Sequence, residues 1–130
     1  MHYIFVCLLI LAFGTLTSAN SAEAASLPGA WRGGGVVKLN SGAVEKIRCR
    51  VSYEKSLGKT FVFHANCSTT AGMISQRGRV VQLSGSRYRG RLYNSDYNVS
   101  ATIKVTVSGR RQIVTATSSE GSLRLTLRKR

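Results

Sequence analysis

Apolar and polar residues alternate along most of the chain after residue 43. The longest alternating stretch covers residues 97–108, where Val99, Ala101, Ile103, Val105 and Val107 are separated by polar residues. Because successive side chains of a β-strand point to opposite faces, this period of two predicts a strand with one buried face. The same pattern covers residues 44–53, 60–69, 87–92 and 123–128, with shorter stretches at residues 36–40, 73–76, 79–84 and 111–117.

These stretches predict eight or nine short strands with turns between them, which is typical of an all-β protein. No segment after residue 24 has helical periodicity. An open sheet of this width would leave two edges unpaired, so we expect a small antiparallel up-and-down β-barrel, with a two-sheet β-sandwich as the alternative. We expect Gly33, Gly34 and Gly35 to form a flexible segment before the first strand.

The N-terminus has the features of an export signal. Residues 4–13 form an uncharged apolar run, and Ala22-Glu23-Ala24 provides a small-residue cleavage site. The run is shorter than the roughly 20 apolar residues of a membrane-spanning helix. We therefore expect a cleaved signal peptide at residues 1–24, a single basic domain at residues 25–130 without a transmembrane segment, and a periplasmic or secreted location.

Removal of the signal would also remove Cys7 and leave two cysteines, Cys49 and Cys67. Disulfides persist in the compartments to which such signals lead. If a turn near residues 55–59 joins two strands so that Val51 pairs with Ala65, the two cysteines lie directly opposite each other, within disulfide reach. We predict a Cys49–Cys67 disulfide, which would stabilise the fold by about 3 kcal/mol according to its loop length.

The residues available for catalysis are few. After residue 24 the chain has one histidine, His64, one aspartate, Asp96, and three glutamates, at 45, 54 and 120. These are too scattered for a zinc site, and no Gly-x-Ser-x-Gly motif is present. We expect no metal, no cofactor and no catalytic residue. The enzymatic alternative that the sequence leaves open is RNA cleavage, with Glu54 as base, His64 as acid and arginines for the phosphate.

The strongest chemical signal is positive charge. The chain has 19 Lys and Arg residues against five Asp and Glu, a formal charge of +14, and 13 of the 19 are arginine. Arginine binds phosphate, sulfate and carboxylate through two parallel hydrogen bonds, so this bias favours contact with anions. Two outward faces carry cations at every second residue: Lys46, Arg48 and Arg50 on one, and Arg87, Arg89 and Arg91 on the other.

These two faces are the predicted anion-binding residues. A solvated surface that protects strand edges from aggregation is the alternative interpretation of the same charges. Nucleic acid is possible but not favoured as the partner, because only Tyr93 places an aromatic ring on the Arg face.

Residues Leu27-Pro28-Gly29-Ala30-Trp31 resemble the Gly-x-Trp opening of the calycins, a superfamily of small barrels that includes lipocalins and secreted bacterial metalloprotease inhibitors. The resemblance implies that Trp31 closes one end of a barrel beneath a basic residue of the last strand, which here would be Arg124, Arg128 or Lys129. It also implies an alternative function, inhibition of a protease by a free N-terminal arm at residues 25–28.

A second resemblance covers most of the chain after the signal. The segments Trp31-Arg32-Gly33-Gly34-Gly35, Glu45 to Tyr53 and Cys67-Ser68 are similar to an uncharacterised family of small exported alphaproteobacterial proteins. From all these observations we expect an exported, non-enzymatic protein that binds an anionic partner: lipopolysaccharide or acidic lipid, a polysaccharide, or an acidic protein. A protease inhibitor, a host-directed effector and a secreted ribonuclease are the alternatives.

Overall fold

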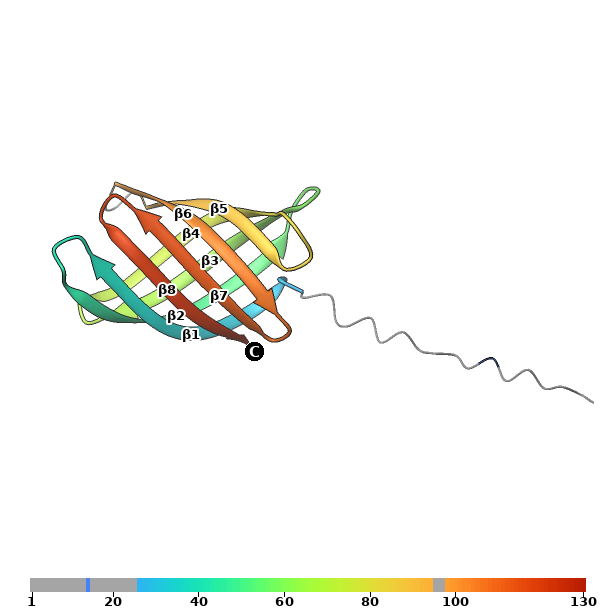
Figure 1. Cartoon of the computed structure of the whole chain (residues 1–130), viewed down its shortest axis with the longest axis horizontal. Coiled ribbons are helices and arrows are strands. Elements are labelled where there is room, and N and C mark those ends of the chain that lie inside the picture. The colour runs from blue at the N-terminus through green and yellow to red at the C-terminus, as the bar shows by residue number, and fades with distance from the viewer. Residues whose placement is uncertain (1–13, 15–25, 95–97) are drawn as a thin grey trace, which may run out of the picture.

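The computed structural model describes residue 14, residues 26–94 and residues 98–130. These residues form one antiparallel sheet of eight strands in sequence order, which closes into a barrel when β8 pairs with β1. The strands are β1 (Gly29–Leu39), β2 (Val44–Lys55), β3 (Thr60–Thr69), β4 (Gly72–Gln82), β5 (Arg87–Asn94), β6 (Val99–Ser108), β7 (Arg111–Ser118) and β8 (Gly121–Lys129) (Figure 1). The predicted barrel is confirmed, and the alternative of a two-sheet sandwich is wrong.

Some predictions fall on residues that the structure does not describe. The predicted signal peptide at residues 1–24, Cys7, Asp96 and Tyr97 lie outside the described residues, with Gly14 as the single described position of the signal. Within the described part of the chain, no helix has the length and hydropathy that a membrane span requires.

The glycines before the predicted first strand are themselves strand residues, so their prediction as a flexible segment was wrong. β1 runs through Gly33, Gly34 and Gly35, and it pairs with β2 on one side and β8 on the other. A Cβ added at Gly33 or Gly35 would overlap the backbone carbonyl oxygens of Thr126 and Arg124 on β8. Glycine is therefore required at these positions because the two backbones approach too closely for a side chain.

Similarly, the two short strands predicted at residues 73–76 and 79–84 are one strand, β4. Gly78 lies in its middle, opposite Phe63 of β3, and a Cβ there would overlap the Phe63 ring. The aromatic ring thus occupies the space that a side chain at Gly78 would need, and the glycine does not interrupt the strand.

The barrel interior is filled with side chains. Most of the described residues predicted to face inward are buried, including Tyr53, Phe61, Phe63 and Tyr88, whereas Leu92, Val99 and Leu123 are half-buried. The Phe61 and Tyr88 rings meet edge to face with centroids 5.4 Å apart. The Tyr53 hydroxyl donates a hydrogen bond of 2.7 Å to Oε1 of Gln112, and burial raises the pKa of this hydroxyl, so it remains a neutral donor.

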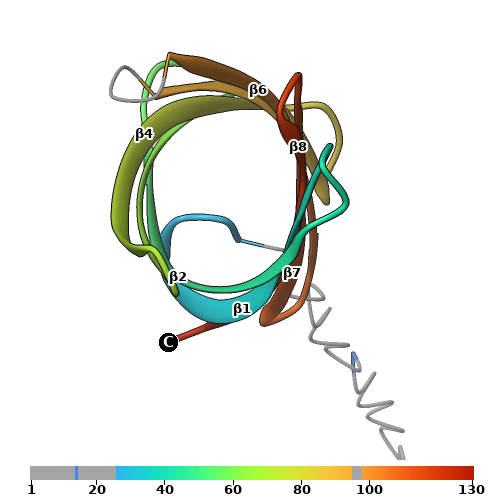
Figure 2. The ribbon, with the colours of Figure 1, turned by 90° about the vertical axis from the view of Figure 1, so that its left-hand side faces the viewer.

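Trp31 closes the end of the barrel where both chain termini of the described domain lie, which we call the closed end. Its Nε1 donates to the carbonyl of Leu27 at 2.9 Å, and both side chains are wholly buried. Figure 2 looks along the barrel and shows the segment that leads into β1 crossing the far opening. Because Leu27 is part of this plug, the prediction of a free arm at residues 25–28 was wrong for Leu27.

Lys129 is the basic residue that covers Trp31. Its Nζ lies 5.6 Å from the centroid of the indole and donates to the carbonyl of Ser26 at 3.0 Å. Arg124 and Arg128, the other two candidates, are exposed on the outer face of β8, so their assignment as barrel-closing residues was wrong. The alternation along β8 explains this result, because Leu125, Leu127 and Lys129 share the inward parity.

The predicted disulfide is confirmed. Val51 pairs with Ala65 and Cys49 with Cys67 across β2 and β3, with a Cα–Cα distance of 4.1 Å between the cysteines. Both sulfur atoms belong to the buried core. The bond therefore joins two strands from the inside of the barrel.

Opening this bond is expected to lower the free energy of unfolding by about 3 kcal/mol, because it closes a loop with a sequence separation of 18. Urea denaturation of the oxidised chain and of Cys49→Ala/Cys67→Ala measures the difference. Equal denaturation midpoints and slopes for the two proteins would contradict the prediction.

Candidate anion-binding surface

Arginines from four adjacent strands lie side by side on the outside of the barrel. Arg32 of β1 is directly opposite Arg50 of β2 on one side and Arg128 of β8 on the other, and Arg128 is opposite Arg111 of β7. At the usual strand spacing of about 4.8 Å, this arginine row extends over roughly 14 Å. Like charges directly opposite each other destabilise a sheet, so repulsion within the row lowers the stability of the fold.

Part of this row borders a groove of about 940 Å³ on the outer wall of the barrel. The groove runs over β8, β1, β2 and β3 and ends at Met73 of β4. Its lining contains four arginines, three polar or apolar side chains and two backbone positions: Arg32, Arg48, Arg50, Arg128, Asn66, Ser68, Met73, Gly33 and Cys49. None of these residues is acidic, so the positive charge of this arginine groove is not neutralised from within.

Gly34 is an outward-facing position of β1 without a side chain, next to Arg48. It shares the outward parity of Arg32 and lies between Arg48 of β2 and Thr126 of β8. A Cβ at this position would lie 3.0 Å from the carbonyl oxygen of Ile47 and 3.6 Å from Cγ of Arg48. The stem of Arg48 therefore lies beside a part of β1 that has no side chain.

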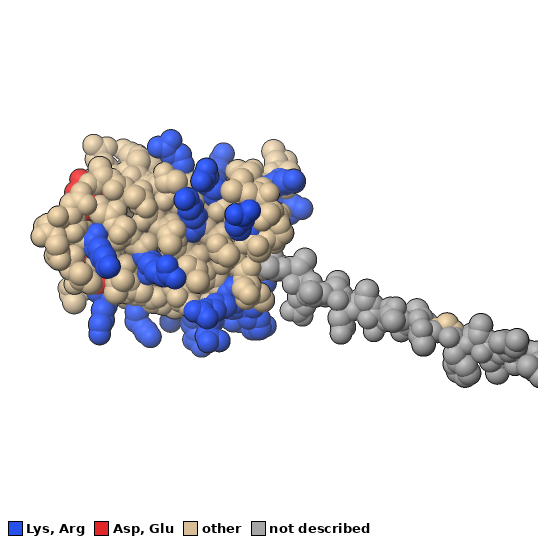
Figure 3. All heavy atoms as spheres, in the orientation of Figure 1, with Lys and Arg blue, Asp and Glu red and all other residues tan. Residues whose placement is uncertain are grey.

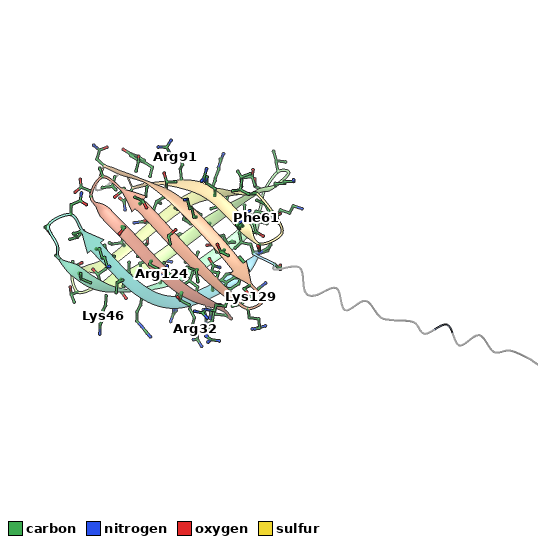
Figure 4. All side chains as sticks on the ribbon, in the orientation of Figure 1. Arg32, Lys46, Phe61, Arg91, Arg124 and Lys129 are labelled. Carbon is green, nitrogen blue, oxygen red and sulfur yellow. A yellow bond between two sulfur atoms is a disulfide. The ribbon has the colours of Figure 1, made fainter. Side chains whose placement is uncertain are left out.

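The second predicted basic face lies on the opposite wall of the barrel. Arg91 of β5 is opposite Arg79 of β4, and Arg89 is opposite Lys104 of β6. Figure 4 shows Arg91 at the top of the barrel and Arg32 and Lys46 at the bottom. Arg87, Arg89 and Arg91 thus form a separate surface from Lys46, Arg48 and Arg50, and one compact ligand cannot contact both.

The sequence did not indicate the arginine row. Alternation along one strand identified Arg48 and Arg50, but the contribution of Arg32, Arg111 and Arg128 depends on the pairing of β1 and β7 with β8. β1 showed no cation pattern because its glycines hide the alternation of the strand. Only the register of the closed barrel places these residues together.

A second, smaller hollow of about 510 Å³ lies over β2, β3 and β4. His64, half-buried, is opposite Ser52 of β2 and opposite Arg77 of β4, and Glu54 and Arg79 lie further along the same hollow. The structure thus brings together Glu54 and His64, the two residues named for RNA cleavage, and adds two arginines beside them.

No group of three or more His, Cys, Asp or Glu side chains in the described ranges is arranged to hold a metal ion. His64 has arginines as its cross-strand and lining neighbours on β4, and the two core cysteines are bonded to each other.

Comparisons with known proteins define the class of fold. No family model and no curated protein matches this sequence. Among solved structures, a redesigned β-barrel is similar with a TM-score of 0.66 and 20% identity, over 82% of this chain and 94% of that one. A redesigned barrel bound to DFHBI is similar with a TM-score of 0.65 and 18% identity, over 80% of this chain and 94% of that one. A de novo designed fluorescence-activating barrel is similar with a TM-score of 0.63 and 19% identity, over 82% of this chain and 97% of that one. At these identities the similarity establishes a closed β-barrel fold.

The arginine row predicts stabilisation by oxyanions. At a concentration ten times its Kd, one bound anion adds about 1.4 kcal/mol to the free energy of unfolding, which raises the Tm of a domain of this size by several degrees. We expect inorganic phosphate to raise the Tm more than chloride at equal ionic strength. In Arg32→Ser/Arg50→Ser this difference should disappear. An equal phosphate effect on the variant and the unchanged chain, measured by thermal unfolding, would contradict a bound anion at the row.

Proposed function

We propose that this chain is an exported, non-enzymatic binding protein that contacts an anionic partner through its arginine-rich outer surface. The single observation that supports this proposal is the arginine row, in which Arg111, Arg128, Arg32 and Arg50 lie in register on four neighbouring strands. Mutual repulsion in such a row is relieved by a bound counter-anion. A lysine surface would give solubility equally well, whereas arginine adds bidentate recognition.

The shape of the surface favours a partner with several negative groups. A row of roughly 14 Å spans more than one phosphate, sulfate or carboxylate group. The strands hold these side chains on a rigid backbone, so little backbone conformational entropy is lost on binding. Lipopolysaccharide or acidic lipid, a polysaccharide and an acidic protein all offer such groups, and the binding experiment below separates them.

Two observations agree with the exported location in this proposal. The core disulfide is compatible with an oxidising compartment, and the apolar segment at residues 4–13 agrees with a signal. A host-directed effector remains an alternative role for the same surface. The protease-inhibitor alternative is weakened, because Leu27 of its proposed arm is buried in the closed end.

The test is binding to lipopolysaccharide, acidic vesicles, heparin and RNA at about 50 and about 200 mM salt, where Debye screening differs roughly twofold. Each charge-assisted hydrogen bond contributes about 1.5–3 kcal/mol. The groove variant Arg32→Ser/Arg50→Ser/Arg128→Ser should therefore bind the preferred ligand at least about tenfold more weakly than the unchanged chain. One ligand bound above the others at the higher salt identifies the class of partner.

The matched control, which we call the β5 variant, is Arg89→Ser/Arg91→Ser/Lys104→Ser, which removes the same charge from β5 and the neighbouring β6 on the opposite wall. We expect this β5 variant to retain most of the binding. Equal loss in the two triple variants would show that net charge alone drives binding, and it would contradict a defined site. Circular dichroism confirms that both variants are folded.

A second candidate function is RNA cleavage, which the hollow around His64 favours. Glu54 would accept the 2′-hydroxyl proton as the O2′–P bond forms, and His64 would donate a proton to O5′ as the P–O5′ bond breaks. Arg77 and Arg79 would stabilise the charge on the phosphorus oxygens. The products are a 2′,3′-cyclic phosphate and a free 5′-hydroxyl.

If this chemistry occurs, His64→Ala is expected to lower RNA cleavage by at least about 10²-fold, the usual contribution of a general acid. The measurement is cyclic-phosphate formation from a short RNA, with the β5 variant as a control for RNA binding. Equal turnover by His64→Ala and the unchanged chain, or no turnover by either, would exclude the reaction.

A further inference from the structure

Two leucines project from neighbouring loops at the closed end. Leu57 lies in the β2–β3 loop and is 86% exposed, and Leu83 begins the β4–β5 loop and is 59% exposed. The amide of Gln82 donates to the carbonyl of Lys59 at 2.9 Å, so the two loops are bound to each other. Two exposed leucine side chains therefore lie on hydrogen-bonded loops at the same end of the barrel, outside the core.

Cations surround both leucines. Lys55 and Lys59 flank Leu57 within its own hairpin. The amide of Leu83 donates to the carbonyl of Arg87 at 2.8 Å, which places Arg87 at the other side of its loop. The remaining turn at this end carries Arg110, and all four cations are exposed. The closed end thus presents two exposed leucines and four exposed cations on its loops and strand ends.

The opposite end of the barrel carries less net positive charge. Glu45 at the start of β2 and Glu120 in the β7–β8 turn lie there together with Lys38 and Lys46, whereas Glu54 is the one glutamate of the described residues near the closed end, next to Lys55. In Figure 3 the acidic side chains are visible only at the end opposite the termini, whereas Lys and Arg extend to the closed end. This polarity would orient the barrel with its closed end toward an anionic surface.

We propose that the closed end docks on a bilayer that contains acidic lipids, with Leu57 and Leu83 in the boundary between headgroups and acyl chains. This inference rests on the proposed function and names its partner as a lipid surface. Lys55, Lys59 and Arg87 would lie at the level of the phosphates, where each cation adds electrostatic attraction. A soluble polyanion would leave the two leucines in water, so their position favours the bilayer.

The arginine row is close to the same end. Arg32 follows Trp31 directly, and Arg128 precedes Lys129, whose Nζ covers the indole. A barrel docked through its closed end would therefore bring these arginines near the headgroups at its rim. The leucines would determine how deeply the barrel enters the bilayer. The arginines would determine how strongly binding depends on the charge of the lipids.

The experiment is co-sedimentation of the oxidised chain with phosphatidylcholine vesicles that contain about 30% phosphatidylglycerol, at about 150 mM salt. Leu57→Ser/Leu83→Ser should partition about tenfold more weakly than the unchanged chain. Val44→Ser is the matched control, because Val44 is an apolar residue with 60% exposure at the opposite end. Heparin binding of the leucine variant should be unchanged.

Insertion of Leu57 into the bilayer can be measured by fluorescence quenching. In Leu57→Trp, vesicles with brominated acyl chains should quench the new indole strongly, whereas the wholly buried Trp31 of the unchanged chain should not be quenched. Absence of quenching in Leu57→Trp, or equal partition of the leucine variant and Val44→Ser, would overturn the docking proposal.

The two proposals fail in different ways. Arginine-dependent binding to heparin without binding to acidic vesicles would overturn lipid docking and leave the proposed function intact. Vesicle binding that depends on the leucines but is unaffected in the groove variant would overturn the groove as the anion site. Thermal unfolding is expected to be unchanged by either leucine substitution, because both side chains are exposed.

Discussion

The pairing of β1 with β8 is the interaction on which the rest of this structure depends. Without it, the sheet would have two exposed edges, and the side chains of its inner face would lack the opposite wall. The close approach of the two backbones is possible only because Gly33 and Gly35 have no side chains. The same pairing places Arg32 between Arg50 and Arg128. The arginine row therefore exists only in the closed barrel.

The closed barrel can tolerate the repulsion within this row because its interior is strongly fixed. A wholly buried Trp31 is hydrogen-bonded to the plug residue Leu27 and covered by Lys129, and a disulfide joins β2 to β3 from within. These contacts lie on the inner face, whereas the arginines lie on the outer face. The alternation of each strand thus separates the residues that stabilise the fold from those that we propose to bind the partner.

Much of the fold was accessible from the sequence, because it depends on local alternation. The period of two in β2 and β3 was sufficient to predict their register and the Cys49–Cys67 bond. The errors in strand assignment lie where a residue has no side chain to reveal its parity. The pattern predicts a flexible segment at Gly33–Gly35 and a gap between two strands at residues 77–78, although Gly33, Gly35 and Gly78 are strand positions with a close neighbour across the sheet.

The candidate site was less accessible, because it depends on register between strands that are distant in sequence. Arg32 and Arg128 are 96 positions apart in the chain yet are direct neighbours. The assignment of Lys129 to Trp31 likewise required the inward parity of the last residues of β8. The meeting of His64 with Arg77 and Arg79 needed a continuous β4, which the sequence pattern had divided in two.

We propose that the arginine groove is a defined anion site and not a diffuse basic surface. This proposal can be tested by titrating the 15N-labelled chain with pyrophosphate and following its amide chemical shifts. We expect saturable shifts concentrated at Gly33, Gly34, Arg48 and Arg50, with little change on β5. Small, non-saturating shifts spread equally over the groove and over Arg87, Arg89 and Arg91 would contradict it.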